Sequence, residues 1–300
     1  ELKEGDQYCA ICLGVLAALP VKRKRRRAVP ARAGLRTPYT MPIQHQPGAP
    51  IQDGGNWMQK PSSATGDIPP GLEYLALVDN IQIKQKRELL EIALGWESNN
   101  KYVIMNGVGQ QIYYAYEETG CCSRQCCGPQ RGFIMHIVDN FGKEVMRINR
   151  EFKICGGCGW CAVPGSCCSH TLTVEAPPGH VIGSVNQRVS CCTGAYEVCD
   201  QDGTVVLECE GPGPFIMCGC GDKVFEIRTP TKSEIGAIRK KWAGFLQEAF
   251  TDADNFGVSF PLDLAVRTKA TLIGATFLID FVHFEQRDDN SRSSNNYREV

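Results

Sequence analysis

The chain has 300 residues, of which 32 are Lys or Arg and 33 are Asp or Glu, so its formal net charge is −1. Because 43% of the residues are hydrophobic, the composition excludes a chain that is disordered throughout. The 31 glycines and 17 prolines imply many turns and argue against a bundle of long helices. The near-neutral total charge argues against nucleic acid as a partner.

Residues 1–67 are expected to form a disordered leader, because Pro and Gly interrupt the sequence repeatedly from Val21 onward. The apolar stretch before that point lacks the pattern of a cleavable secretory signal. A basic run in the leader favours contact with anionic lipid or an import receptor, and the alternative is a solvated stretch of charge. The run consists of Lys22, Arg23, Lys24, Arg25, Arg26 and Arg27. The prolines of the leader also offer contacts to protein partners.

Short apolar runs alternate with turn signals from Ile68 to Phe260. This pattern predicts about ten strands, and their spacing of roughly 8 to 12 residues is typical of a β-sandwich or a β-barrel. The predicted strands lie at 101–105, 111–116, 132–138, 144–148, 170–174, 181–185, 195–198, 204–208, 214–218 and 223–227.

Two later segments are predicted to be helices. Residues 238–250 place apolar side chains at helical spacing, which indicates a helix packed on the surface. Residues 266–284 are apolar on nearly every side, so this helix either spans a membrane or is buried inside the protein, and both alternatives stay open. Its apolar residues include Ala270, Leu272, Ile273, Phe277, Leu278, Ile279 and Phe281. A polar tail, 289–300, follows.

The 17 cysteines are clustered, and four pairs are adjacent in the chain. Adjacent Cα atoms lie about 3.8 Å apart, closer than disulfide geometry prefers, so we expect mostly reduced thiols in a cytosolic protein. The densest stretch begins at CGGCGWC, whose spacing is compatible with a zinc site or with buried structural thiols. Its cysteines are Cys155, Cys158, Cys161, Cys167 and Cys168.

Six collinear segments together resemble the phospholipid scramblase family. They are PPGLEYL (69–75), DNFGKEVMRINR (139–150), EAPPGHVIG (175–183), GCGDKVFEI (219–227), KKWAGFLQEAFTDADNFGVSFPLDL (240–264) and ATLIGATFLIDFVHFE (270–285). The resemblance covers 68–285 and defines a scramblase domain over 68–288. It implies a mainly β fold, a closed tubby-like antiparallel barrel of about 12 strands around the C-terminal hydrophobic helix.

The resemblance also implies a function. Members of the family are expected to move phospholipids between membrane leaflets in both directions, in response to calcium and without ATP, at the cytosolic face of the plasma membrane. Their cysteine-dense stretch is thioacylated, so Cys155 to Cys168 become candidates for palmitoylation, although the interspersed glycines and the AVPGS segment loosen the cluster here. Arg239, Lys240 and Lys241 occupy the place of a nuclear-import segment in some relatives, and the alternative is an exposed basic helix face.

Residues 252–263 match an EF-hand calcium loop in part. Such a loop supplies oxygen ligands around one ion and has a Gly at its sixth position, where Gly257 stands. The candidate ligands are Asp252, Asp254, Phe256, Val258 and Asp263. A further Asp of the family pattern is replaced by Ala265, so we expect weak calcium binding at most. The alternative is that the carboxylates only cap a turn.

No motif of a hydrolase, a nucleotide-binding loop or a zinc protease occurs in the sequence, so no covalent chemistry is predicted and the chain is not expected to be an enzyme. Two functions remain. The first is a calcium-dependent phospholipid scramblase held at the membrane by acylated cysteines and the C-terminal helix. The second is a membrane-tethered adaptor that binds lipid headgroups or proteins, has a possible nuclear pool and transports nothing.

Overall fold

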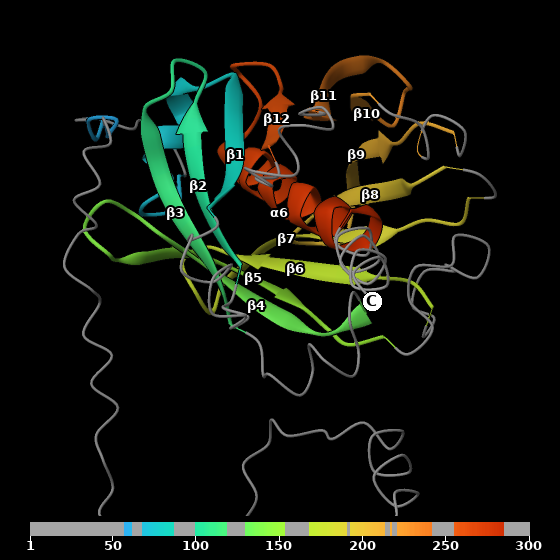
Figure 1. Ribbon diagram of the computed structural model, residues 1–300, viewed down its shortest axis with the longest axis horizontal. Coiled ribbons are helices and arrows are strands. Elements are labelled where there is room, and N and C mark those ends of the chain that lie inside the picture. The colour runs from blue at the N-terminus through green and yellow to red at the C-terminus, as the bar shows by residue number, and fades with distance from the viewer. Residues whose placement is uncertain are drawn as a thin grey trace, which may run out of the picture. The chain divides into compact units, whose positions relative to one another are not determined.

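The computed structural model describes residues 57–61, 68–86, 100–118, 130–153, 168–190, 193–213, 217, 221–241 and 255–284. Within these ranges twelve antiparallel strands close into one barrel, and helix α6 (Val266–His283) runs through its middle (Figure 1). A 3-10 helix, η1 (Glu73–Leu77), precedes the first strand. The strands are β1 (Asn80–Lys86), β2 (Lys101–Asn106), β3 (Gln111–Glu118), β4 (Phe133–Val138), β5 (Glu144–Arg150), β6 (Thr171–Glu175), β7 (Val181–Gln187), β8 (Ala195–Asp200), β9 (Val205–Glu210), β10 (Lys223–Arg228), β11 (Glu234–Lys240) and β12 (Asn255–Ser259). The predicted fold class is confirmed.

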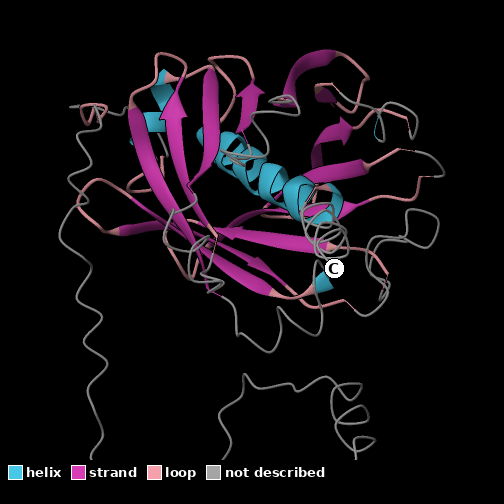
Figure 2. Cartoon of the chain, viewed as in Figure 1, coloured by secondary structure: helices cyan, strands magenta, loops and turns pink. Residues whose placement is uncertain are grey.

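Each strand pairs with its neighbours in chain order, and β12 returns to pair with β1. Ile81, near the start of β1, lies opposite Asn106 of β2 on one side and Val258 of β12 on the other. Figure 2 shows the strands as a wall around the helix. Because every strand of the barrel has two paired neighbours, the wall leaves no exposed strand edge.

The strands are built from side chains that alternate between the core and the outer face. In β4, Met135 and Ile137 are fully buried, whereas their neighbours in the strand are half-buried. This alternation with a period of two is the pattern on which the sequence-based strands rest. Each predicted strand that the described residues cover is present, with bounds that agree within two residues.

Helix α6 is buried on every side from Lys269 to Phe281. The helix approaches the wall most closely at two glycines. A Cβ atom on Gly274 would lie 2.8 Å from Val174 Cγ2, and one on Gly183 of β7 would lie 2.5 Å from Thr271 Oγ1. The barrel thus surrounds the apolar helix with apolar side chains, which is the buried alternative of the two that the sequence left open. Among the residues described above, no helix combines the length and hydrophobicity that crossing a membrane requires.

Three strands, β1, β11 and β12, were not predicted. Strand β11 corrects the start of a predicted helix, and β12 corrects part of the predicted calcium loop. Strand β11 includes Ile238, Arg239 and Lys240, so the predicted helix 238–250 is wrong at its start, and from residue 242 onward it lies outside the described residues. Ile238 is buried between Phe225 of β10 and Val258 of β12, and this cross-strand packing decides the conformation. The third unpredicted strand, β1, closes the barrel.

Some predicted segments lie outside the described residues. They include the basic leader, the tail after Phe284 and most of the predicted strand 214–218. The contacts of the fold begin before the predicted domain boundary at Asp67. Trp57 forms a β-bridge with Gln111, and the amide of Met58 donates to the carbonyl of Gln111 over 2.9 Å.

Candidate functional site

Lys269 and Asp280 are the charged residues within the buried part of α6, and both bind groups of the surrounding fold. The ammonium of Lys269 donates to the carbonyl oxygens of Leu75 (3.0 Å), Val78 (2.9 Å) and Leu262 (2.7 Å). A lysine ammonium has three N–H donors, so three carbonyls match its capacity. The side chain therefore ties α6 to η1 and to the turn before α6.

Two carboxylates act on this ammonium from outside the helix. Burial lowers the pKa of Lys269, and the negative charges of Asp79 and Asp263 raise that pKa and favour the charged form. The ammonium also lies 5.2 Å from the ring centroid of Phe260, close enough for a cation–π contact. Asp263, a predicted calcium ligand, therefore interacts with a cation that belongs to the protein itself.

The other end of α6 is held by aromatic and polar contacts. The hydroxyl of Tyr102 donates to Asp280 Oδ2 over 3.0 Å, and the Tyr102 ring packs edge-on against Phe277 with centroids 5.0 Å apart. One turn further on, His283 Nε2 lies 2.7 Å from the hydroxyl of Tyr196. Both ends of the helix thus have specific polar partners in the wall, which fixes its depth in the barrel.

A buried ion pair lies beside the same end of α6. Arg131 bonds to Glu117 through its Nη2, 2.9 Å from Oε1, and both side chains are almost fully buried. The guanidinium also lies 4.9 Å from the ring centroid of Phe281. Phe281 in turn stacks on Phe133 of β4 with centroids 4.1 Å apart. The pair connects β3 and the start of β4 to the aromatic end of the helix.

A second buried arginine pairs with a histidine. Arg150 Nη2 lies 3.1 Å from His170 Nδ1, and its guanidinium lies 5.6 Å from the ring centroid of Phe133. Burial, followed by the positive charge of Arg150, lowers the pKa of His170 to about 3. The imidazole is therefore neutral at physiological pH and can accept a hydrogen bond from the guanidinium.

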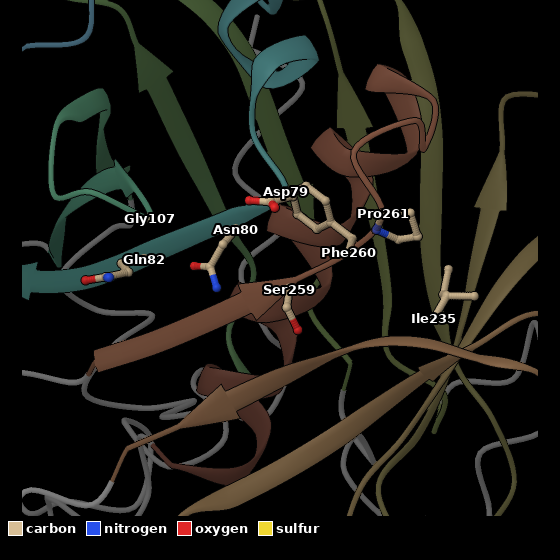
Figure 3. A pocket seen from close by; sticks show the side chains of 8 residues that line it. All are labelled: Asp79, Asn80, Gln82, Gly107, Ile235, Ser259, Phe260 and Pro261. Carbon is tan, nitrogen blue, oxygen red and sulfur yellow. The ribbon is translucent and has the colours of Figure 1, made fainter.

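A groove opens on the barrel surface at the end where α6 begins (Figure 3). Its volume of about 540 Å³ falls within the range of small-molecule sites. Its polar side chains come from β12, from β1 and from the residue before β1, and its apolar part includes Phe260. The polar residues are Asp79, Asn80, Gln82 and Ser259. In Figure 3 the carboxylate of Asp79 lies beside the Phe260 ring, and Asn80 and Ser259 lie on neighbouring strands.

The described half of the predicted calcium loop is a strand, which corrects the expectation of a loop there. Phe256 and Val258 belong to β12, and their side chains are buried in the core. The five residues of β12 span about 16 Å, and Asp263 follows four residues after the end of the strand.

Nothing else in the described part of the chain replaces this site, because no group of three His, Cys, Asp or Glu side chains there could hold a metal ion. Asp252 and Asp254 lie outside the described residues, so calcium binding by these two carboxylates stays a prediction.

The predicted thiol and basic sites are covered only in part. Cys155, Cys158, Cys161 and Cys167 lie outside the described residues, as does the run 22–27, and Cys168 is half-buried. Palmitoylation and zinc binding at these thiols stay predictions. Two further thiols, Cys199 and Cys209, are buried in strands, and burial raises the pKa of Cys209 to about 12, which makes it an inert structural thiol.

The three basic residues predicted on a helix face are placed differently. Arg239 lies in β11 and its Nη1 donates to Ser259 Oγ over 3.2 Å. The ammonium of Lys240 lies 4.1 Å from the ring centroid of Phe284, the residue after α6. Lys241 follows the strand and is exposed. The basic segment is thus a strand end, in contact with β12 and with the end of α6.

Sequence reasoning missed the groove and the role of Lys269. A lysine inside an otherwise apolar helix is a signal that a partner must exist, because an isolated buried charge is costly. Two of its three partners are backbone carbonyls 194 and 191 residues away in the chain, and no residue type marks them.

Comparison with known proteins places this barrel in a family. A sequence profile described as Scramblase matches residues 58–286. Phospholipid scramblase 1 of Rattus norvegicus is 44% identical over 261 residues, which cover 86% of this chain and 76% of the rat protein. Phospholipid scramblase 2 of Homo sapiens is 44% identical over 248 residues, which cover 82% of this chain and 80% of that protein. Phospholipid scramblase 4 of Homo sapiens is 37% identical over 250 residues, which cover 82% of this chain and 74% of that protein.

No solved structure matches the chain. The family assignment therefore rests on sequence: the profile spans the barrel from Met58, before β1, to beyond the end of α6, and the relatives align over most of their own length. The chain belongs to the scramblase family.

Proposed function

We propose that this chain moves phospholipids between the two leaflets of a membrane, in both directions and without ATP. The observation that carries the proposal is its place in a family whose aligned members are named phospholipid scramblases. Moving a lipid requires no covalent step, in agreement with a sequence that has no nucleotide-binding loop and no hydrolase motif. The substrates are then phospholipids, and the chain acts at a membrane.

A reconstitution tests the proposal. The full-length chain is placed in vesicles that carry a fluorescent phosphatidylcholine in both leaflets, and dithionite then bleaches the label exposed on the outside. If the chain moves lipids, the inner-leaflet label is bleached as well, with no ATP present. Protein-free vesicles and a trapped soluble dye control for leakage. Inner label that survives equally with and without the chain would contradict the proposal.

The burial of α6 favours a second candidate function. Because the helix fills the barrel and its polar ends bind the fold, its apolar surface is already covered by protein. A membrane-tethered adaptor, which binds headgroups or proteins and has a nuclear pool, would use such a closed barrel without transporting anything. The same vesicles distinguish the two functions, since an adaptor binds them and leaves the inner label intact.

Calcium dependence is a separable part of the proposal, supported by the family resemblance. Its remaining candidate oxygen donors are Asp252 and Asp254, since Asp263 acts on the buried Lys269 ammonium. We expect the double variant Asp252→Asn/Asp254→Asn to lose the difference between calcium and a chelator in the bleaching assay. Asp263→Asn is the matched control and should keep that difference. The opposite result would place the ion at Asp263.

Attachment to the cytosolic face of the plasma membrane is proposed to come from acyl chains on the thiols Cys155 to Cys168, together with the basic run of the leader. Several acyl chains anchor a protein firmly, whereas a basic segment binds anionic lipid in a salt-dependent way. Hydroxylamine, which cleaves thioesters, should therefore release the chain from cell membranes only when high salt is also present. Release by salt alone would show that no acyl anchor exists.

A further inference from the structure

Three turns at the end of the barrel where α6 begins share one geometry: those between β2 and β3, β4 and β5, and β8 and β9. Each turn starts with an Asn or Asp whose side-chain oxygen accepts hydrogen bonds from the backbone N–H groups two and four residues later. These first residues are Asn106, Asp139 and Asp200, and the nitrogen–oxygen distances lie between 2.8 and 3.2 Å. The fourth residue of each turn is a Gly with positive φ, of 84° at Gly109, 73° at Gly142 and 81° at Gly203. The first and fourth residues therefore define the turn, and the third is free to vary.

The third residue forms the tip of each turn, and its character differs among the three turns. Val108 is 82% exposed and Phe141 is 72% exposed, whereas the exposed Asp202 stands at the same place in the turn between β8 and β9. Asp202 shows that this turn forms with a charged tip, so the turn itself does not require Val108 or Phe141. Because exposed apolar surface is unfavourable in water, these two side chains point to a contact outside the barrel.

Further apolar side chains join these two tips on one arc of the same end. Of the eight large hydrophobic side chains that are exposed in the described ranges, five lie here. They are Leu77, Val108, Phe141, Val181 and Leu262. The five border β12 and β1 to β7, which are contiguous in the barrel, whereas the turns after β8 and β10 have polar tips, Asp202 and Thr231. We call the five the apolar rim of the groove, because Val108 and Leu262 adjoin its lining residues.

The spacing of the rim side chains favours a soft partner. The tips at Val108 and Phe141 are separated by two strand spacings, or about 10 Å. A protein partner needs a continuous, closely packed patch, whereas single apolar side chains at turn tips can each enter the boundary between lipid headgroups and acyl chains. The proposed function already makes a phospholipid membrane the surface that this chain meets.

We propose that the barrel enters a phospholipid membrane with its apolar rim, so that the end where α6 begins faces the bilayer. Val108 and Phe141, the most exposed of the five, enter the lipid, and the tips at Asp202 and Thr231 stay in water. The inference rests on the proposed function, because that function supplies the membrane, and it names the surface and the side chains that contact the lipid. Acyl chains and a basic leader would attach the chain, and the rim sets the orientation of the barrel.

A tryptophan at the turn tips tests this orientation. Val108→Trp, Phe141→Trp and Asp202→Trp place the same fluorophore at the third position of three equivalent turns. The full-length chains are mixed with vesicles of phosphatidylglycerol and phosphatidylcholine brominated in its acyl chains, which quenches indoles that enter the lipid. After subtraction of the emission of the unaltered chain, the added indole should be quenched in Val108→Trp and Phe141→Trp but not in Asp202→Trp. Equal quenching in all three, or quenching in Asp202→Trp alone, would overturn the proposal.

Charged tips test whether the rim contributes to binding. Val108→Asp and Phe141→Asp give these turns the tip that the turn between β8 and β9 already has, so the fold should persist, and urea unfolding verifies it. High salt screens the basic leader, so the full-length chain without acyl groups then binds phosphatidylcholine vesicles through the rim. Each substitution should weaken that binding by about tenfold, because one apolar side chain no longer leaves water.

Thr231→Asp is the matched control, because it adds the same charge at an exposed polar tip, and it should leave the binding unchanged. Equal binding by Phe141→Asp and Thr231→Asp would overturn the proposal. Sedimentation without lipid examines the other occupant of the rim, a second copy of this chain. A dimer of the unaltered chain that Phe141→Asp dissociates would also overturn the proposal, since the rim would then be covered by protein.

The outcomes separate this inference from the proposed function. If the indoles at positions 108 and 141 are quenched while inner-leaflet label survives dithionite, the rim enters lipid and only the proposed function fails. If the chain exposes inner-leaflet label to dithionite while neither indole is quenched, the proposed function stands and this inference fails.

Discussion

Lys269 makes three hydrogen bonds with one side chain, to the carbonyl oxygens of Leu75, Val78 and Leu262. Replacement by Met keeps the length of the side chain and removes all three donors. A buried acceptor that loses its partner costs about 1–3 kcal/mol. We therefore expect Lys269→Met to lower the free energy of unfolding by at least ~3 kcal/mol in urea titrations at pH 7.

Lys232 provides the control for this variant. Its ammonium pairs with Glu208 at the exposed surface of the barrel. Exposed ion pairs contribute about 0–1 kcal/mol, so Lys232→Met should change the free energy of unfolding by no more than that. If both variants lose the same stability, the three carbonyls do not depend on the Lys269 ammonium.

The buried imidazole of His170 makes the free energy of unfolding depend on pH. Burial, and then the charge of Arg150, lowers the pKa of His170 from 6.5 to about 3. The folded chain thus favours the neutral imidazole, so this contribution to stability is complete above pH 6.5 and is lost as the pH falls from 6.5 toward 3. Between pH 7 and pH 5 the loss amounts to about 2 kcal/mol.

Substitution separates this histidine from the other titrating groups. His170→Gln cannot be protonated, so its free energy of unfolding should fall by about 2 kcal/mol less between pH 7 and pH 5 than that of the unaltered chain. His180→Gln, at an exposed turn between β6 and β7, is the matched control. Identical pH profiles for His170→Gln and the unaltered chain would show that the imidazole is not buried next to Arg150.

At the scale of elements, the contact between α6 and β6 depends on a helix position without a side chain. A Cβ atom on Gly274 would lie 2.8 Å from Val174 Cγ2 and 3.0 Å from Leu172 Cδ2. Gly274→Leu therefore forces the helix and the strand apart, and overpacking of this kind costs about 1–3 kcal/mol. Thermal or urea unfolding measures the loss. Thr268→Leu, at a half-buried position of the first helical turn, adds similar volume and should cost less.

A double-mutant cycle tests whether the clash is the cause. Val174→Ala removes the atoms that Gly274→Leu would meet, so the double variant should be more stable than the sum of the single effects predicts, by about 1 kcal/mol. Strict additivity would mean that the two positions do not touch in the folded chain.

Strands with strict local alternation could be predicted, and strands defined by distant partners could not. The run FIMHIV of β4 alternates between buried and half-buried residues, so its period is visible in the sequence. In β11, Ile238 and the later Trp242 also fit a helical spacing, and the choice depends on pairing with β12. β1 becomes a strand by pairing with β12, which lies at the far end of the domain sequence. Local patterns contain no information about such contacts.

The candidate site also has a part that the local sequence predicts and a part that depends on contacts between distant residues. The apolar residues of α6 could be assigned to a hydrophobic helix from composition, and every one that we named is buried. The groove could not be predicted, because the rim residue Asp79 and Ser259 come from opposite ends of the domain and meet only when β1 pairs with β12. In the described half of the predicted calcium loop, a five-residue strand stands where the spacing suggested a turn, and calcium binding itself stays a prediction.

At the scale of the whole barrel, the groove lies at one end, and the strand ends that lead into the cysteine-rich segments lie at the other. The groove lies where α6 begins, whereas the chain segments rich in cysteine leave from the strand ends Glu118, Arg150 and Gln187, near the end of α6. A six-residue strand spans ~20 Å, and the segment 154–167 alone can reach up to about 46 Å when extended. The acyl chains proposed for these segments could therefore contact the same membrane as the apolar rim of the groove.

The position of α6 also predicts on which side of a membrane the C-terminus lies. Removing the helix would expose the apolar lining of the whole barrel and leave the Lys269 carbonyls and Tyr102 without their partners. We therefore expect the helix to stay in the barrel when the chain is bound to a membrane. A tag placed after Val300 and a tag placed before Glu1 should then be cleaved by protease from the same, cytosolic side of sealed vesicles.

A luminal marker protein must stay intact in that experiment to show that the vesicles are closed. Chains with Lys269→Met provide a second comparison, because a helix that has lost its three carbonyl contacts is held less firmly in the barrel. If the C-terminal tag of the unaltered chain is protected while the N-terminal tag is cleaved, α6 has left the barrel and crossed the bilayer. That result would contradict a membrane-bound form with this fold, and it would require the strands to close around some other core.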